Sequence, residues 1–134
     1  MTIEELHRLW DKTNRGKSAA SEHDLQVSCV RWFRLQYPQY AKLLFAIPNG
    51  GQRNAVVAAK LKAEGVQAGV PDLFLAVPGG DYHGLWIEMK NGKAGRLSAL
   101  QGSMIAALVK QGYRCEVCHS FGEFENVVKE YITK

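Results

Sequence analysis

Residues 72–90 read DLFLAVPGGDYHGLWIEMK, and this stretch decides how we expect the chain to fold. Two short apolar segments, 72–77 and 85–90, flank a glycine-rich connection, which is the pattern of a β-hairpin. Side chains alternate between the two faces of a strand, so Glu88 and Lys90 are expected on the same face. One face of the hairpin is therefore predicted to be charged.

The register of the hairpin decides whether a second carboxylate joins them. If the connection folds symmetrically about Gly80 or Asp81, Asp72 lies opposite Glu88 or Met89. A slip of one residue would send Asp72 to the opposite face, and the length of the turn does not fix the register. We expect the symmetric pairing, which brings two carboxylates and an amine together.

Outward from the hairpin, extended and helical segments interleave along the whole chain. Turn residues bound each segment, and Ser21 is expected to cap the second helix. We expect strands over 43–47, 72–77, 85–90 and 113–117, and helices over 2–12, 22–37, 53–64, 99–111 and 121–132. This order predicts an α/β fold, with a central sheet, helices packed on its faces and an extra N-terminal helix.

The composition narrows the class of protein. A chain of 134 residues is long enough for one domain with a buried core. Lys and Arg outnumber Asp and Glu by 17 to 13, and the net charge of +4 is a modest bias toward polyanionic partners. No segment approaches the ~18 apolar residues of a membrane span. Three cysteines, an odd number, favour a reducing compartment. We expect a cytoplasmic protein of a bacterial or phage-infected cell, with no membrane partner.

The second helix carries a carboxylate on its predicted core face. At about 100° per residue, Glu22 and Gln26 fall inside the apolar arc of this helix. The apolar members of the arc are Leu25, Cys29, Val30, Trp32, Phe33 and Tyr37. A carboxylate that points toward a core needs a cation, a metal or several donors. The alternative is that Glu22, in the first turn, stays solvated and interacts favourably with the helix dipole.

The predicted charged face has a specific chemistry. Two carboxylates a few ångströms apart repel one another, and a hard divalent cation such as Mg²⁺ removes that penalty because it prefers oxygen ligands. Lys90 would be a poor magnesium ligand, but its amine can help to deprotonate a metal-bound water or offset charge on a phosphate. This combination is typical of phosphodiester hydrolysis. The alternative is an aspartate at a strand start and a Glu-x-Lys pair on a solvated face.

Several short motifs surround these residues in a fixed order. They are Glu22 with Gln26, Ile47-Pro-Asn-Gly-Gly51, Gly69-Val-Pro-Asp-Leu-Phe74, Ile87-Glu-Met-Lys90, and Leu97-Ser98 followed by Gln101. The set resembles the PD-(D/E)XK nuclease superfamily and, within it, the VRR-NUC family, over about residues 21–111. The resemblance implies a restriction-endonuclease-like core with a central mixed β-sheet, dependence on Mg²⁺ or Mn²⁺, and DNA as the substrate.

The resemblance also implies roles for individual residues. Asp72 and Glu88 would bind the metal, and Met89 would contribute its backbone carbonyl. Lys90 would activate water. Glu22 would be a further carboxylate that reaches the metal directly or through water.

Gln101 is a fifth candidate for the catalytic site. It falls on the apolar arc of its helix, so its amide is expected to face inward. That arc is formed by Leu97, Leu100, Met104 and Leu108. Residues 98–101 also spell a capping box, which could serve only to start the helix.

Other residues are expected to contact DNA. Asn49, Gly50 and Gly51 could let the backbone approach a phosphate closely, although with the preceding proline they equally form an ordinary turn. Several basic side chains could contact phosphates, and the alternative is that they only lie on solvated helix faces and loops. These are Arg31, Arg34, Arg53, Lys60, Lys62, Lys93 and Arg96.

The segment Cys115-Glu-Val-Cys-His119 spells the attachment motif of a c-type haem. Covalent haem attachment usually needs an exported protein, whereas we expect this one in the cytoplasm. Residues 113, 115 and 117 also alternate as in a strand, which favours a structural role for this segment. A zinc site would need about four ligands, and this is a single cluster. We expect buried free thiols and no haem. A haem- or redox-binding protein is the alternative from another functional class.

Together these features predict a single nuclease domain over residues 1–134, with an N-terminal extension (1–20), a catalytic core (21–111) and a C-terminal strand and helix (112–134). We expect a metal-dependent DNA endonuclease that prefers branched DNA such as Holliday junctions. One chain offers one site, so symmetric cutting of two strands predicts a homodimer. The main alternative is a non-catalytic DNA-binding module of the same fold.

Overall fold

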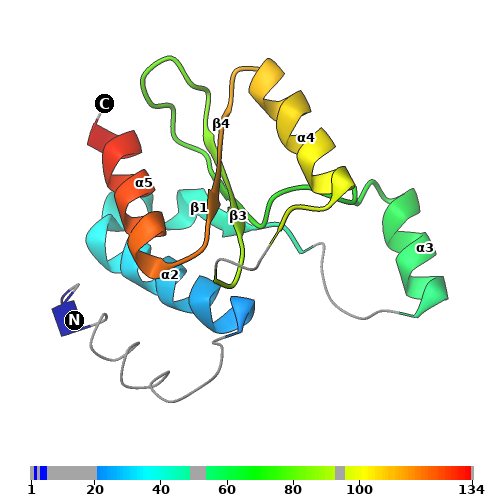
Figure 1. Ribbon diagram of the computed structural model, residues 1–134, viewed down its shortest axis with the longest axis horizontal. Coiled ribbons are helices and arrows are strands. Elements are labelled where there is room, and N and C mark those ends of the chain that lie inside the picture. The colour runs from blue at the N-terminus through cyan, green and yellow to red at the C-terminus, as the bar shows by residue number, and fades with distance from the viewer. Residues whose placement is uncertain (1, 3, 6–20, 49–53, 93–95, 134) are drawn as a thin grey trace.

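The computed structural model describes residues 2, 4–5, 21–48, 54–92 and 96–133, and Figure 1 shows their arrangement. The helices are α2 (Glu22–Gln36), the 3₁₀ helix η1 (Pro38–Leu43), α3 (Ala55–Ala63), α4 (Ala99–Lys110) and α5 (Phe121–Thr133). The strands are β1 (Leu44–Ala46), β2 (Leu73–Leu75), β3 (Leu85–Met89) and β4 (Arg114–Cys118). The helix predicted over 2–12 lies almost wholly outside the described residues. Within them, no helix is long and apolar enough to cross a membrane.

The four strands form one mixed sheet in the order β1-β2-β3-β4. The β1-β2 and β2-β3 pairs are antiparallel, whereas β3 and β4 are parallel. A parallel pair needs a long crossover connection, and α4 lies within the one that joins β3 to β4. The predicted α/β class with a central mixed sheet is therefore confirmed.

The β2-β3 hairpin is symmetric about Gly80. Leu73 pairs with Ile87, Phe74 with Trp86 and Leu75 with Leu85. Continued by one residue, this register sets Asp72 opposite Glu88, which is the first of the two pairings that the sequence allowed. The apolar pattern holds the register, because a slip of one residue would turn the core side chains of one strand out of the core.

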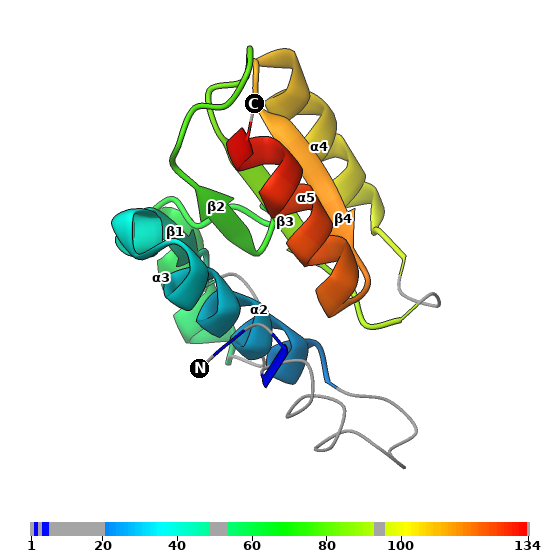
Figure 2. The same ribbon diagram turned by 90° about the vertical axis from the view of Figure 1, so that its left-hand side faces the viewer.

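One face of the sheet carries the main core. Alternate side chains of β2 and β3 point to it and are fully buried: Leu73, Leu75, Leu85, Ile87 and Met89. Helices α2 and α5 cover this face, and Figure 2 looks onto them with the sheet behind. Where the two helices meet, the Trp32 ring contacts Phe121 and Phe124 edge-on, at centroid distances of 6.1 and 6.0 Å.

The opposite face of the sheet is covered by α4 (Figure 1). Phe74 and Trp86 stack there at a centroid distance of 4.2 Å. We expected the apolar arc of this helix to face inward, and its members Gln101, Met104 and Leu108 are half-buried, although no residue of α4 is fully buried. Leu97, just before the helix, and Leu100, in its first turn, remain 40% and 63% exposed.

The predicted element boundaries are right to within about two residues. Ser21 caps α2 as expected, its side chain accepting from the Asp24 N–H. The sequence did not reveal η1, in which Pro38 occupies the first turn, where a missing N–H costs no hydrogen bond. Helix α3 starts at Ala55 rather than at 53, because the Asn54 side chain caps it.

Gly69 sets the distance between α4 and the segment that leads into β2. Its φ of +88° lies in the left-handed region that favours glycine, and a Cβ at this position would lie 2.6 Å from the Leu100 carbonyl oxygen. The backbone just before Asp72 therefore packs directly on the first turn of α4. That turn carries Gln101, so this contact ties two parts of the predicted site together.

Replacing Gly69 with alanine is expected to lower the free energy of unfolding by at least about 2 kcal/mol more than the matched change Gly80→Ala. Both glycines have positive φ, but a Cβ at Gly80 meets nothing within 4 Å, so the difference isolates the clash with α4. Chemical denaturation of the two variants measures it. Equal losses of stability would show that the close approach of Gly69 to α4 has no energetic weight.

Candidate active site

Three charged side chains meet at one end of the β2-β3 pair, on the face that α4 covers. Asp72 directly precedes β2, Glu88 lies in β3, and Lys90 directly follows β3. The Lys90 Nζ lies 3.5 Å from the Glu88 Oε2, and the Met89 main-chain N–H donates to the Asp72 Oδ2 at 2.8 Å. The convergence predicted from the hairpin is therefore present.

Glu88 is the most deeply buried of these groups, with 3% of its surface exposed. Gln101 supports it from α4, because the Gln101 Nε2 donates to the Glu88 Oε2 at 2.7 Å. The other end of the same amide accepts from the Ser98 N–H at 2.9 Å, and the Ser98 Oγ accepts from the Gln101 N–H at 3.2 Å. Gln101 thus completes a capping box and also hydrogen-bonds to Glu88. The two roles predicted for it, helix capping and a place at the site, are compatible.

The buried carboxyls have perturbed acidity. Burial, and then the neighbouring charge of Asp72, raise the pKa of Glu88 to about 7, although Lys90 opposes the shift. Burial also raises the pKa of Asp72, against the hydrogen bond from the Met89 N–H. In the absence of a cation, the raised pKa values therefore favour the protonated form of these carboxyls. Shifts of this kind are found where a site binds a metal or transfers protons.

Glu22 lies nearby but not where the helical wheel put it. The predicted core face of α2 is right for Leu25, Cys29, Trp32 and Phe33, which are buried. Glu22 itself is exposed in the first turn of the helix, as in the solvated alternative. Its charge still raises the pKa of Asp72, and both residues line one groove.

No cluster of three or more potential metal-binding His, Cys, Asp or Glu residues occurs among the described residues. Glu22 does not join Asp72 and Glu88 in such a cluster, although it lines the same groove as Asp72. Mg²⁺ is commonly held by one or two carboxylates and keeps several waters, so a pair of buried carboxylates fits it.

Met89 presents its backbone to the site and its side chain to the core, where it is fully buried. In an antiparallel pair, the N–H and C=O of one residue point toward the same neighbouring strand. Because the Met89 N–H meets Asp72, its carbonyl is directed to the same side. The role of this carbonyl as a metal-binding oxygen stays a prediction.

The residues expected to contact DNA are placed only in part. Asn49, Gly50, Gly51, Arg53 and Lys93 lie outside the described residues. Arg96 is exposed, two residues before the cap of α4. Arg31, Arg34, Lys60 and Lys62 are also exposed. A role of these residues in contacting DNA stays a prediction.

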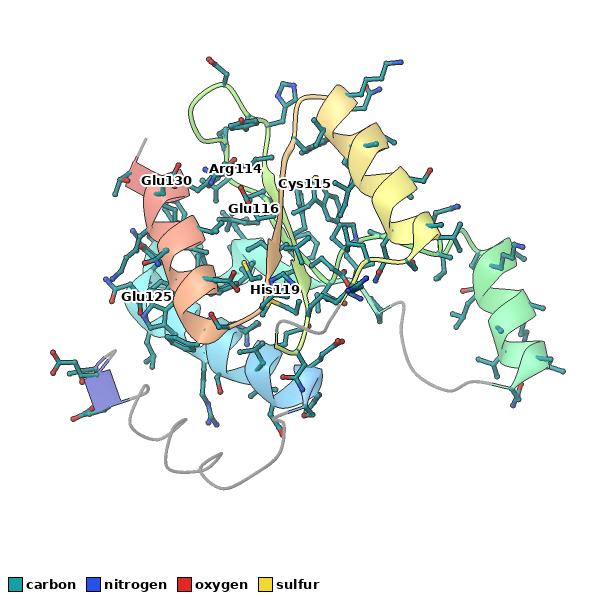
Figure 3. All side chains as sticks on the ribbon, viewed as in Figure 1. Arg114, Cys115, Glu116, His119, Glu125 and Glu130 are labelled. Atoms are coloured by element: carbon teal, nitrogen blue, oxygen red, sulfur yellow. The ribbon has the colours of Figure 1, made fainter. Side chains whose placement is uncertain are left out.

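The Cys115–His119 segment lies largely in β4, and its two cysteines point to opposite faces of the sheet. Cys115 pairs with Trp86 on the α4 side, and Cys118 pairs with Met89 on the core side. Figure 3 shows Cys115 on the α4 side of the strand, with Arg114 and Glu116 toward α5. Burial raises the pKa of Cys115 to about 11 and that of Cys118 to about 12. Two protonated thiols on opposite faces do not suit a common haem.

A groove of about 690 Å³ adjoins the carboxylates and follows α2. Its lining includes Asp72, Glu22 and Gln26, and further along α2 it includes Arg31 and Arg34. The sequence motifs indicated Glu22 and Gln26 as site residues. The basic composition indicated the arginines as possible phosphate contacts. That these residues share one cavity with Asp72 depends on how α2 docks on the sheet, which no local sequence pattern indicated.

Comparison with known proteins identifies the family and the fold. The family model of the VRR-NUC domain matches residues 12–122, which is most of the chain. A solved structure named "VRR_NUC domain protein" superposes with a TM-score of 0.76 at 29% sequence identity, and the match covers 85% of this chain and 89% of that chain. No curated protein is similar enough to match. On the family match and the shared fold, the chain belongs to the VRR-NUC family of nuclease-type domains.

Proposed function

We propose that this protein is a metal-dependent DNA endonuclease whose catalytic residues are Asp72, Glu88 and Lys90, with Glu22 and Gln101 in supporting roles. The observation that carries the proposal is the pairing of the buried Glu88 with the half-buried Asp72, with a lysine amine 3.5 Å from Glu88. A nuclease-type domain is expected to bind nucleic acid, and a net charge of +4 is compatible with that.

Asp72, Glu88 and the Met89 carbonyl are the oxygen donors that would hold Mg²⁺ or Mn²⁺, with Glu22 acting through water. The donor set fits the ion, because the carboxylate pair is buried and its pKa values are raised in the absence of a cation. When bound, such an ion supplies Lewis-acid stabilisation of charge on the phosphate and makes bound water more acidic.

The protein's own groups divide the remaining work. The Met89 N–H fixes the Asp72 carboxylate, and the Gln101 amide fixes that of Glu88. Lys90 places a positive charge beside both, where its amine can orient the attacking water or offset charge on the scissile phosphate. Because three different elements hold these groups, little reorganisation is needed when the substrate binds.

Asp72→Asn, Glu88→Gln and Lys90→Met are each expected to lower the rate of metal-dependent DNA cleavage by at least about 10²-fold, because each removes a group from the reacting centre. Glu116→Gln is the matched control. This carboxylate lies one strand away, points to the opposite face and pairs with Arg114 at 3.0 Å. Its cleavage rate should stay within about twofold of the parent protein.

Gel assays of rigorously purified proteins on four-way, flap, duplex and single-stranded DNA measure these rates and rank the substrates. We expect the four-way junction to be cut fastest. Metal-dependent cutting by Asp72→Asn at the parental rate would contradict the assignment of the site. A parent protein that binds DNA but cuts none of these substrates would instead favour the non-catalytic DNA-binding module.

The raised pKa of Glu88 predicts how stability depends on pH without metal. Between its ordinary pKa of 4.5 and the folded value of about 7, the folded chain binds more protons than the unfolded chain. The contribution of Glu88 to the free energy of unfolding therefore falls as pH rises through this window, and remains low above it. Glu88→Gln should remove this part of the pH dependence.

Mg²⁺ should reverse that trend, because it binds the deprotonated carboxyls. Thermal unfolding at pH 5.5 and pH 8, in EDTA and in Mg²⁺, measures both effects. At about 100 times its dissociation constant, Mg²⁺ should stabilise the protein by about 2.7 kcal/mol at pH 8 and by clearly less at pH 5.5. A Mg²⁺ effect that survives unchanged in Glu88→Gln would argue against this metal site.

We further propose that the active form is a homodimer. In α3, every residue except Leu61 is exposed, and Val56 is 71% exposed although the helix is mostly apolar. A nine-residue helix is too short to be stable alone in water, and an apolar helix is normally buried. Helix α4 likewise buries none of its residues. A second copy that covers α3 and α4 would bury the exposed apolar side chains of both helices in one two-fold interface.

Sedimentation is expected to give the mass of two chains. The double change Val56→Glu/Val57→Glu should raise the dimer dissociation constant at least about tenfold, because it places charges in an apolar interface. Leu35→Glu is the control, since Leu35 is 50% exposed on α2, away from α3 and α4. A parent protein that sediments as one chain, with and without DNA, would refute the dimer.

A further inference from the structure

The groove beside Asp72 has a charge pattern that the cleavage chemistry does not use. Along α2, residues four apart lie in a row, so Glu22, Gln26, Val30 and Arg34 follow one another along the helix. His23, Val27 and Arg31 form the neighbouring row. Both rows line the groove, whose remaining lining is Ala46 and Asp72. The groove thus begins at the carboxylates and ends at two arginines.

The arginines lie far along α2 from Glu22, at the other end of the groove. Arg31 and Arg34 follow Glu22 by 9 and 12 residues, which is about 14 and 18 Å along the helix axis. Both are exposed, and neither forms an ion pair or a side-chain hydrogen bond with another described residue. Their guanidinium donors are therefore directed to the groove without an internal acceptor among these residues.

The middle of the groove is apolar. Val27 is 44% exposed there, and Val30 and Ala46 complete this section. A strand of nucleic acid presents the same alternation, with anionic phosphates separated by sugars and bases that pack on apolar surface. Arginine suits the phosphates, because its planar guanidinium can donate two hydrogen bonds to one phosphate group.

We propose that this α2 groove holds the DNA strand on one side of the cut, with Arg31 and Arg34 contacting backbone phosphates a few nucleotides from the scissile one. This proposal rests on the proposed function and adds to it a binding site for one DNA strand. Val27 and Val30 contact the intervening sugars. The two arginines position the strand and take no part in the bond-breaking step.

The test compares Arg31→Gln/Arg34→Gln with Lys42→Gln/Lys110→Gln. Both changes remove two positive charges from exposed positions, but Lys42, in the last turn of η1, and Lys110, at the end of α4, do not line the groove. Fluorescence anisotropy in Ca²⁺ gives the affinity of each protein for a labelled junction and a labelled duplex at several salt concentrations. Circular dichroism and melting temperature check that each variant is folded.

The arginine variant should bind DNA at least about tenfold more weakly, and the slope of log K against log salt should fall by about 1.8, or about 0.9 for each lost phosphate contact. The lysine control should change the slope by less than about 0.5 and the affinity by less than about threefold. Arg31→Lys/Arg34→Lys, which keeps the charges, should recover most of the salt slope. In cleavage assays, the arginine variant should show a raised KM with kcat within about threefold of the parent.

An unchanged slope and affinity in the arginine variant, or an equal loss in the lysine control, would overturn the proposal. A fall in kcat without a change in KM would also overturn it, because it would make these residues part of the chemical step. A parent protein that binds DNA without cutting it would refute the proposed nuclease function. The groove proposal would then still stand if the arginine variant alone lost affinity.

Discussion

The pairing of β2 with β3 is the constraint on which the rest of the molecule depends. Leu73 opposite Ile87 and Leu75 opposite Leu85 put one set of side chains into the core beneath α2 and α5. The same register leaves Asp72 and Glu88 together on the other face. A slip of one residue would break the core and separate the carboxylates at once. Packing of the apolar face therefore fixes the geometry of the charged one.

Keeping a buried carboxylate pair requires several compensating interactions. Lys90 supplies a positive charge, the Met89 N–H donates to Asp72, and the Gln101 amide donates to Glu88. These partners do not fully offset the burial, since the pKa of Glu88 remains at about 7. In the function that we propose, a divalent ion would offset this remaining electrostatic cost, because it would favour the charged form of both carboxyls.

The two faces of the sheet differ in how completely they are covered. On one face, α2 and α5 bury large side chains such as Trp32 and Phe124. On the other face, α4 covers the sheet but leaves its own outer side exposed, and α3 packs on little of the described chain. Apolar surface left open by two helices is a physical reason to expect a partner there. The α2 groove, with Asp72 at its lining, is not covered by either helix.

The sequence by itself determined the α/β class, the hairpin and its charged face, because alternating side chains and turn residues are local signals. It also determined the capping residues Ser21 and Ser98, which act within one helical turn. The fold decided which register the hairpin adopts, because only packing against the core favours one pairing of the two strands over the other. The tertiary structure likewise decided that Glu22 is exposed and that Gln101 both caps a helix and reaches Glu88. It also decided that Arg31 and Arg34 share a groove with Asp72, because residues distant in sequence meet only where α2 and α4 dock on the sheet.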